Sequence, residues 1–256
     1  MSKAFWNKEY ASSKHLTLSD EPASDLQTFE RWAVRNAEWH PFPKGGMVLD
    51  VGCGNGRNIV YVCKQHDMKG LGFDMSGIAV EQAMQAAERN ISKEGKKVSE
   101  LTSFKTQSAA EPIPLPDQSV DVVLDMMVSH CLRAKDRKKL LAEMVRVIKP
   151  YGWLFFKTFI LDGDFHAKKL ILEHPDPGID FKDPQTGVSG HEAGEKNSYI
   201  HPRIGEFEHV YTEDEIYEMF RPYFKIHKAI KSYKHFRDGK PYKRRTISVY
   251  MERLRE

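Results

Sequence analysis

Apolar residues in this chain follow two alternating patterns. Short, nearly continuous apolar runs indicate buried strands. Between them, apolar residues recur every three or four positions, as on one face of a helix. This alternation predicts an α/β fold with a mostly parallel sheet and helices on both faces. The strands predicted in the first two thirds of the chain are 48–51, 70–73, 98–106, 119–125 and 153–159.

Helix signals surround these strands. We predict a helix at 24–39, capped by Ser24 or Asp25. A second helix is expected to begin after Ser76, whose hydroxyl group is a suitable N-cap. A third is predicted at 134–149, where apolar residues share one face.

The end of the chain predicts a helix followed by a hairpin. Thr212 is its expected N-cap, and Glu215 follows at the spacing of a capping box. Strands are predicted at 223–236 and 242–251, joined by a turn at 237–240.

Composition indicates an ordinary globular protein. The chain has 256 residues, of which 40% are hydrophobic and 29% charged. We find no apolar run of membrane-spanning length and no apolar signal segment, so we expect a cytoplasmic protein. The three cysteines form no C-x-x-C pair, which argues against disulfides and zinc. We expect a single domain, 1–256, with four parts: 1–43, 44–160, an insertion at 161–210, and 211–256.

The net charge of +3 is unevenly distributed. Residues 225–256 contain 11 Lys and Arg against 3 Asp and Glu, which leaves 28 against 33 for the rest of the chain. Such a basic segment either attracts nucleic acid or is the solvated face of an edge hairpin. Because the charges are spaced rather than contiguous, we favour the second interpretation.

A glycine-rich loop follows the first strand. Gly52, Gly54 and Gly56 lie between a strand and a helix, where a ligand can approach bare backbone and the N–H groups of the helix start. Asp74 ends the second strand, 18 residues after Gly56, where a carboxylate can accept both hydroxyl groups of a ribose. Together they predict a nucleoside-binding site.

Two residues argue against a dinucleotide. The G-x-G-x-x-G fingerprint would need a third glycine at Arg57. Asp50 stands where a pyrophosphate would pass, and its carboxylate repels phosphate but attracts an ammonium group. We therefore expect a nucleoside that carries an amino group, rather than NAD.

The segment 48–56, Val-Leu-Asp-Val-Gly-Cys-Gly-Asn-Gly, resembles motif I of the class I S-adenosylmethionine-dependent methyltransferases. Residues 108–117 and 143–152 are similar to two further segments of that family. The resemblance implies a Rossmann-like seven-stranded sheet, closed by an antiparallel C-terminal pair. It also implies S-adenosylmethionine as cofactor and S-adenosylhomocysteine as product.

The resemblance also implies the cofactor contacts. Ala109 replaces the family's usual aspartate, so an acceptor for the adenine amino group must come from Gln107, Ser108 or elsewhere. The expected cofactor-binding residues are Asp50, Gly52, Cys53, Gly54, Asn55, Gly56, Asn58, Asp74, Met75, Ser108, Ala109, Ala110, Asp125, Met126, Met127, Trp6 and Tyr10.

Trp6 and Tyr10 belong to an aromatic N-terminal segment. In similar methyltransferases such a segment covers the cofactor and substrate as a lid. Alternatively, Trp6, Phe29 and Trp32 form a small hydrophobic cluster of their own.

His130 follows the fourth strand at the edge of the sheet where open α/β folds bind ligands. It is the best-placed histidine for a general base, or else a loop histidine without a chemical role.

The insertion at 161–210 lacks a clear periodic pattern and contains five histidines. No metal-binding spacing occurs among them, so we predict no metal. We expect a flap over the substrate, with His191, Tyr199 and His201 as polar contacts beside His130.

We therefore expect a methyltransferase acting on a small-molecule acceptor, by in-line displacement. An RNA methyltransferase, resembling those that modify the wobble uridine of tRNA, is the first alternative, because RNA could bind the basic C-terminal hairpin. A non-catalytic nucleoside-binding module is the second.

Overall fold

The computed structural model describes residues 2–12, 19–182, 189–232, 235–237, 240–242 and 244–255. Seven strands form its central sheet: β1 (Met47–Val51), β2 (Lys69–Asp74), β3 (Thr102–Thr106), β4 (Val120–Met126), β5 (Ile148–Phe159), β10 (Phe224–Ser232) and β13 (Thr246–Arg253). Their order is β10-β13-β5-β4-β1-β2-β3. Neighbours among β1 to β5 are parallel, whereas β13 runs antiparallel to both β5 and β10.

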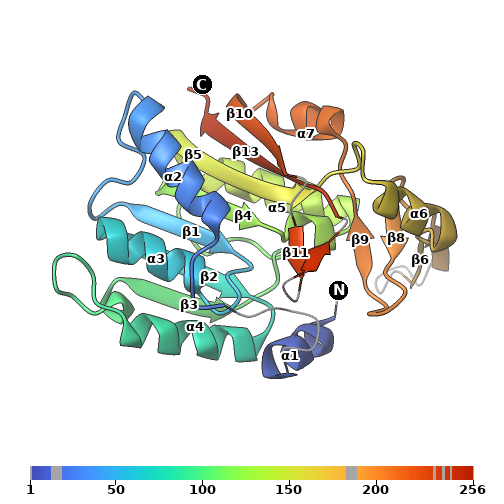
Figure 1. Ribbon diagram of the computed structural model, residues 1–256, viewed down its shortest axis with the longest axis horizontal. Helices are drawn as coiled ribbons and strands as arrows, with labels where there is room; N and C mark the ends of the chain where they lie inside the picture. The colour runs from blue at the N-terminus through green and yellow to red at the C-terminus, as the bar shows by residue number, and fades with distance from the viewer. Residues whose placement is uncertain are drawn as a thin grey trace.

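Helices pack on both faces of the sheet (Figure 1). One face is covered by α2 (Ser24–Asn36), α3 (Arg57–His66) and α4 (Gly77–Arg89), and the other by α5 (Ala134–Val147) and α7 (Glu213–Phe220). Successive side chains of a strand point to opposite faces, so Leu154 and Phe156 join one core cluster, and Trp153 and Phe155 the other. The predicted Rossmann-like fold is confirmed.

The carboxyl ends of β1 and β4 meet at the centre of the sheet. The chain runs from β1 to β2 and β3 on one side, then returns to β4 on the other. Val51 and Asp125 are paired where this reversal occurs. Open α/β sheets bind ligands in the crevice at such a point. Among the described residues, no helix has the length and apolar character needed to cross a membrane.

The insertion has more secondary structure than the sequence indicated. It contains α6 (Phe165–Glu173) and two hairpins, β6 (Ile179–Lys182) with β7 (Ser189–Glu192), and β8 (Ser198–Ile200) with β9 (Phe207–His209). A small core joins α6 and the β8–β9 hairpin to β5: Phe159, Ala167, Leu170, Tyr199 and Val210. The expectation of a segment without clear elements was wrong, because strands of three or four residues are too short to produce a periodic pattern.

The remaining elements are short. They are α1 (Lys3–Ser12), η1 (Val98–Glu100), η2 (Ser129–Cys131), β11 (His235–Arg237) and β12 (Lys240–Tyr242). Figure 1 shows α1 and the insertion at the end of the sheet toward which the parallel strands point. Both therefore lie at the same edge of the sheet as the carboxyl ends of β1 and β4.

Several predicted boundaries needed correction. The helix predicted at 24–39 ends at Asn36, and its N-cap is Ala23, without a side-chain cap. Asp25 instead pairs with Lys157 of β5. By contrast, the cap at Ser76 is confirmed, since its hydroxyl oxygen accepts a hydrogen bond from the N–H of Ala79 at 3.2 Å.

Two strands also differ from the prediction. The strand predicted at 98–106 is the 3-10 turn η1 followed by β3, so only its second half pairs with β2. The helix predicted at 134–149 ends at Val147, and β5 begins at once at Ile148 rather than at Trp153.

The C-terminal hairpin is confirmed as the antiparallel pair β10 and β13, extended by β11 and β12. Residues 238 and 239 of its predicted turn lie outside the described residues. Thr212 caps α7, and its hydroxyl oxygen accepts the N–H of Glu215 at 3.1 Å. The reciprocal half of the capping box is replaced, because the Glu215 carboxylate lies 2.8 Å from Nε2 of His209.

Candidate functional site

The loop 52–56 after β1, here called the donor loop, requires its glycines. Gly52, Gly54 and Gly56 have φ angles of +61°, +56° and +79°. A β-carbon at Gly52 would overlap the side chain of Val128, and one at Gly56 would lie 2.8 Å from the β-carbon of Ala83. The donor loop is therefore packed through its backbone, which lets a ligand reach the start of α3.

Asp74 lies at the tip of β2 against the donor loop. Its Oδ2 accepts a hydrogen bond from the N–H of Gly54 at 3.0 Å, and its Oδ1 one from the N–H of Ser76 at 2.8 Å. Burial raises the pKa of this carboxyl group, while the two N–H donors lower it. A carboxylate held in this way can still accept ribose hydroxyl groups at its free lone pairs.

Asp50 carries a buried oxygen without a partner. The residue is 2% exposed, and its Oδ2 has no hydrogen bond. Burial, reinforced by the charge of Asp74, raises its pKa to about 8, although Arg57 and the N–H of Ile59 act in the opposite direction. An unpaired buried carboxylate is costly, so a ligand ammonium group at this position would be strongly favoured.

The segment after β3 supplies another unpaired acceptor. The N–H of Gln107 donates to the carbonyl oxygen of Asp74 at 2.9 Å, which places Gln107 beside the ribose acid. Its Nε2 donates to the carbonyl oxygen of Pro112, but its buried Oε1 has no partner. Ser108 accepts the N–H of Ala110, and Ala109 packs against the core. Gln107 is thus the acceptor best suited to an adenine amino group.

Other predicted contacts are engaged within the protein. The N–H of Cys53 donates to the carbonyl oxygen of Phe73 at 2.9 Å, and Met75 is half-buried. Two asparagines, Asn55 of the donor loop and Asn58 at the start of α3, bind the segment before α2. Asn55 donates to the carbonyl oxygen of Ser19 at 3.1 Å. Asn58 accepts the N–H of Ala23 at 3.0 Å and contacts the sulfur of Met126 at 3.5 Å. The two asparagine side chains therefore hold the loop in place.

The N-terminal helix α1 covers the donor loop. Tyr10 lies against Gly54, so that a β-carbon there would meet its hydroxyl group. The carbonyl oxygen of Tyr10 accepts Nε2 of Gln82 at 3.0 Å, and Asn7 accepts the hydroxyl group of Ser76 at 2.8 Å. Sequence reasoning missed Asn7, which carries no motif signal.

Trp6 also belongs to α1. Its ring packs on Phe5 and Tyr10, with centroids 5.1 and 6.4 Å away. The alternative cluster of Trp6 with Phe29 and Trp32 was wrong. The rings of Phe29 and Trp32 pack instead on Trp153 of β5 and Tyr250 of β13.

The segment after β4 connects the donor loop to the insertion. Asp125 is fully buried and accepts hydrogen bonds from the N–H and hydroxyl group of Ser129, which orders η2. Burial raises its pKa to about 6. Met127 has a φ of +68°, and its side chain packs against the core of the insertion. Asp125 and Met127 therefore shape the wall between the two regions.

His130 lies in η2 with its ring buried. The ring meets Phe159 edge-on at 5.1 Å, and its Nε2 is 3.4 Å from the sulfur of Cys131. Burial lowers its pKa to about 4, while the charge of Glu208 acts in the opposite direction. The imidazole is therefore neutral at pH 7, in the form that can accept a proton.

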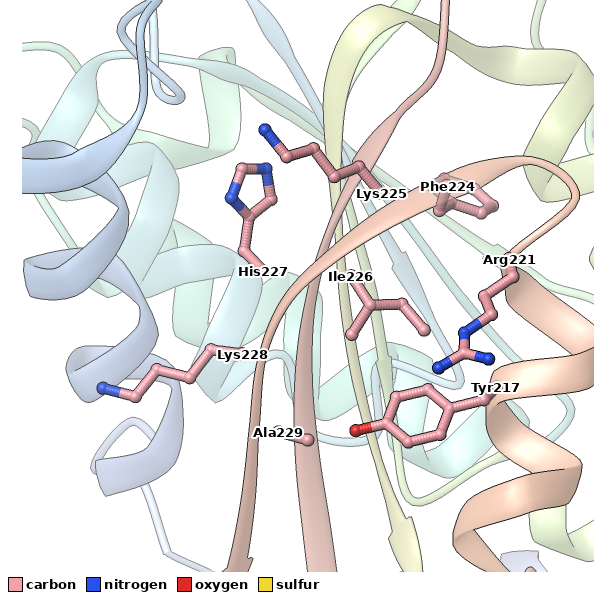
Figure 2. Close-up of a pocket in the computed structure, with 8 residues that line it drawn as sticks. All are labelled: Tyr217, Arg221, Phe224, Lys225, Ile226, His227, Lys228 and Ala229. Atoms are coloured by element: carbon pink, nitrogen blue, oxygen red, sulfur yellow. The ribbon is translucent and has the colours of Figure 1, made fainter.

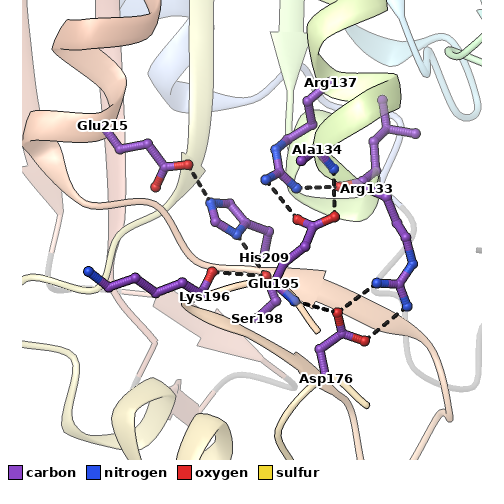
Figure 3. Close-up of polar contacts among 10 residues, drawn as sticks. Arg133, Ala134, Arg137, Asp176, Glu195, Lys196, Ser198, His209 and Glu215 are labelled. Atoms are coloured by element: carbon purple, nitrogen blue, oxygen red, sulfur yellow. Dashed lines mark hydrogen bonds and ion pairs between the residues drawn. The ribbon is translucent and has the colours of Figure 1, made fainter. Parts of the chain in front are cut away.

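Ion pairs fix the insertion to the start of α5 (Figure 3). Arg133 binds both carboxylate oxygens of Asp176, at 2.6 and 2.9 Å. Glu195 accepts Nη2 of Arg137 at 2.9 Å and the N–H of Ala134 at 2.7 Å. Bidentate contacts of this kind hold one geometry, so this side of the insertion is a fixed wall.

The three other polar contacts predicted for the substrate lie in different places. Tyr199 is fully buried and donates its hydroxyl group to Glu208. His201 is 8% exposed, with its ring 6.2 Å from that of Tyr199. His191 is paired with Asp180 on the β6–β7 hairpin, and its side chain is 55% exposed. The structure does not enclose His191, because its hairpin extends into solvent.

A groove on the opposite end of the sheet carries part of the basic segment. It has a volume of about 340 Å³ and lies between α7 and the first half of β10 (Figure 2). That half of β10 pairs with the end of β13, next to the amino end of β5. The groove is therefore remote from the donor loop. Because β10 is an edge strand, the location agrees with the solvated-edge interpretation of its lysines.

Comparison with known proteins identifies the family. The methyltransferase domain family matches residues 49–156. The ubiquinone biosynthesis O-methyltransferase of Thiobacillus denitrificans is 31% identical over 178 residues, which cover 60% of this chain and 69% of that protein. The 27-O-demethylrifamycin SV methyltransferase of Amycolatopsis mediterranei is 30% identical over 147 residues, 57% of this chain and 51% of that protein.

Solved structures share the fold. The 1,6-didemethyltoxoflavin-N1-methyltransferase of Burkholderia thailandensis, solved with S-adenosylhomocysteine, has a TM-score of 0.63 at 14% identity. The match covers 99% of this chain and 87% of that one. An S-adenosylmethionine-dependent methyltransferase of Methanosarcina mazei has a TM-score of 0.62 at 20% identity. That match covers 85% of this chain and 97% of the Methanosarcina chain.

The described residues fit S-adenosylmethionine as the methyl donor. Asp50 offers an unpaired carboxylate oxygen to an ammonium group, Asp74 a carboxylate to a ribose, and Gln107 an unpaired acceptor to an adenine amino group. All three lie around a donor loop whose glycines permit close approach. The chain belongs to the class I S-adenosylmethionine-dependent methyltransferases.

Proposed function

We propose that this enzyme methylates a small-molecule acceptor enclosed between α1, η2 and the insertion. The proposal rests on one observation, the position of α1 between the two halves of the site. On one side, Asn7 is bonded to Ser76 at the start of α4. On the other, the N–H and hydroxyl group of Ser2 donate to the carboxylate of Glu206, at 3.1 and 2.9 Å. A site closed by its own chain favours a molecule small enough to be surrounded.

The predicted roles of the donor-side residues follow from their geometry. Asp50 would hold the ammonium group, Asp74 the ribose hydroxyl groups, and Gln107 the adenine amino group. When bound, S-adenosylmethionine supplies an activated methyl group and its own leaving group. The protein therefore has to position the acceptor in line with the methyl carbon and exclude water.

His130 remains the best-placed candidate base. It lies in η2, directly after β4, and its neutral ring can take a proton from an acceptor hydroxyl or amino group. Its low pKa makes it a weak base, so it suits an acceptor that loses its proton readily. Acceptors that need no deprotonation would leave His130 with a packing role against Phe159.

The names of the related methyltransferases support a small acceptor. The relatives include the ubiquinone biosynthesis O-methyltransferase, the 27-O-demethylrifamycin SV methyltransferase and the ajmaline N-methyltransferase of Rauvolfia serpentina. The RNA alternative has less support, because the basic groove of β10 lies away from the donor loop.

The proposal can be tested with methyl-labelled S-adenosylmethionine. The enzyme is incubated with a small-metabolite extract and, separately, with total RNA. We expect label in the metabolite pool, resistant to nuclease. Label that appears in RNA and becomes acid-soluble only after nuclease treatment would overturn the proposal. Any turnover at all would exclude the non-catalytic alternative.

A further inference from the structure

Arg244 is a buried cation outside the donor site. It is 1% exposed and lies two residues before β13, whose first residues pair with the carboxyl end of β5. Its Nη1 donates to the hydroxyl oxygen of Tyr199 at 2.6 Å and to Oε2 of Glu208 at 3.0 Å. Its guanidinium carbon lies 3.8 Å above the ring centroid of Phe159. We call these four residues the Arg244 cluster.

Two nitrogens of this guanidinium group have no hydrogen-bond partner among the residues that the structure describes. They are Nε and Nη2, which together carry three N–H donors. Oδ2 of Asp164 is 3.5 Å from Nε but accepts the N–H of Arg245 at 2.8 Å. Buried donors of a charged group are costly when unsatisfied. The remaining side of the guanidinium fork is thus left unsatisfied by the described residues.

The Arg244 cluster adjoins the methyl-donor site. The ring of Phe159, which lies under Arg244, is also contacted by His130 of η2. The neighbouring thiol of Cys131 is buried, and its pKa is raised by burial and by the charges of Glu208, Asp125 and Asp74. Strand β9, which carries Glu208, packs against η2, and Val128, directly before η2, lies against Gly52 of the donor loop. An acceptor beside η2 would reach the Arg244 cluster.

The charges around Arg244 select the kind of acceptor group. Arg244 already faces two carboxylates, Glu208 at 3.0 Å and Asp164 at 3.5 Å. The charge of Arg244 holds the pKa of Glu208 below its usual value, against the effect of burial, so Glu208 is ionised. The sum over these three groups is −1. A further carboxylate would be repelled, whereas a neutral carbonyl oxygen would satisfy the free donors without adding charge.

We propose that Nε and Nη2 of Arg244 bind a neutral carbonyl oxygen of the methyl acceptor, such as that of a ketone, amide or quinone. This inference rests on the proposed small-molecule function and names a feature of its substrate class. In this arrangement Tyr199, Glu208 and Phe159 hold the guanidinium group in place, and Arg244 orients the acceptor toward the methyl donor.

The test uses four probes that share one ring: benzamide, acetophenone, benzoate and benzyl alcohol. Each is titrated into protein saturated with S-adenosylhomocysteine, and the Nε–H resonance of Arg244 is followed by NMR. Arg244→Lys assigns that resonance by its loss. We expect benzamide and acetophenone to shift it, with benzoate and benzyl alcohol binding at least tenfold more weakly. No shift with any probe, or equal affinity for benzoate, would overturn the inference.

A second variant tests the charge argument in the opposite direction. Glu208→Gln keeps an acceptor oxygen for Nη1 and for Tyr199 but removes one negative charge. We expect the affinity for benzoate to rise about tenfold, so that the ratio of benzamide affinity to benzoate affinity falls. Glu192→Gln, which removes an exposed acid of the insertion, is the control and should change neither affinity. An unchanged benzoate affinity in Glu208→Gln would contradict the proposal.

The two proposals fail in different ways. Label in RNA would reject the small-molecule function, whatever the probes do. Label in the metabolite pool together with a silent Arg244 resonance would reject the carbonyl site alone.

Discussion

The hydroxyl group of Tyr10 occupies the space that a β-carbon on Gly54 would need. One residue lies on the N-terminal helix and the other in the donor loop, 44 positions later in the sequence. A larger residue at position 54 would therefore have to displace the Tyr10 side chain and adopt a positive φ.

A double-mutant cycle measures this fit. Gly54→Ala should destabilise the protein by about 1–3 kcal/mol, through its positive φ and through contact with Tyr10. In a Tyr10→Phe background the penalty should shrink, with a coupling of about 0.5–3 kcal/mol. Chemical denaturation gives each free energy of unfolding.

Gly95→Ala is the control for that cycle. Gly95 has a φ of +79°, but nothing lies within 4 Å of the position of its β-carbon. Gly95→Ala should therefore lower the free energy of unfolding through backbone strain alone, by the same amount with and without Tyr10→Phe. Additive effects of the Gly54 and Tyr10 substitutions would mean that the hydroxyl group does not restrict the loop.

Glu206→Ala should loosen the closure of α1. The substitution removes both hydrogen bonds from Ser2. If these exposed bonds together contribute about 1 kcal/mol, S-adenosylhomocysteine should dissociate about fivefold faster. Stopped-flow displacement measures the rate. Glu218→Ala on the exposed side of α7 should leave it unchanged, and an equal rate in Glu206→Ala would argue against α1 as a lid.

Asp74→Ala should weaken binding of S-adenosylhomocysteine by at least about tenfold. The variant loses a charged acceptor for two ribose hydroxyl groups, and each charge-assisted hydrogen bond contributes about 1.5–3 kcal/mol. Isothermal titration calorimetry gives the dissociation constant, with the exposed Asp117→Ala as control. Unchanged affinity would show that the ribose is bound elsewhere.

Asp50 should make the ligand-free protein less stable as pH rises. Its pKa is about 8 in the folded protein against the usual 3.8, so the folded state binds more protons between these values. Stability from this group is therefore present at low pH and is lost as pH rises toward 8. Between about pH 6.5 and 8, Asp125, with a pKa of about 6, is mostly ionised, and His130, with a pKa of about 4, is neutral in the folded protein. In the unfolded chain His130 has its ordinary pKa of 6.5 and adds a change of opposite sign at the lower end of this range, equally in the unaltered protein and in Asp50→Asn.

The measurement is the melting temperature across pH 6.5 to 8. Asp50→Asn should reduce the fall in melting temperature as pH rises. Saturating S-adenosylmethionine should have the same effect on the unaltered protein, because the ammonium group of the ligand would favour the ionised carboxylate of Asp50. The exposed Asp214→Asn should keep the original slope. Parallel slopes for Asp50→Asn and the unaltered protein would show that Asp50 is not the group responsible.

The local geometry around the donor loop could be predicted from the sequence because its signals are local. The glycines of the donor loop, Asp74 at the end of β2 and the cap at Ser76 all follow from residues within about thirty positions of one another. Backbone requirements such as a positive φ leave a direct trace in residue type.

The acceptor half was harder to predict, because its contacts join distant segments. Ser2 donates hydrogen bonds to Glu206, and Arg133 to Asp176. No periodic pattern in the sequence predicts either contact. Arg244 was counted within the basic C-terminal segment and interpreted as surface charge, whereas it is 1% exposed. Local composition does not distinguish a buried arginine from its exposed neighbours, because its partners come from β8 and β9.

The ion pairs that fix the insertion also make the acceptor half a separable part. The region matched by the methyltransferase domain family ends at residue 156, just before the insertion begins. Two arginines at the start of α5, Arg133 and Arg137, carry the polar attachment through Asp176 and Glu195. A replacement insertion would have to present carboxylates to these two arginines and new partners to Arg244, whereas the donor loop would need no change.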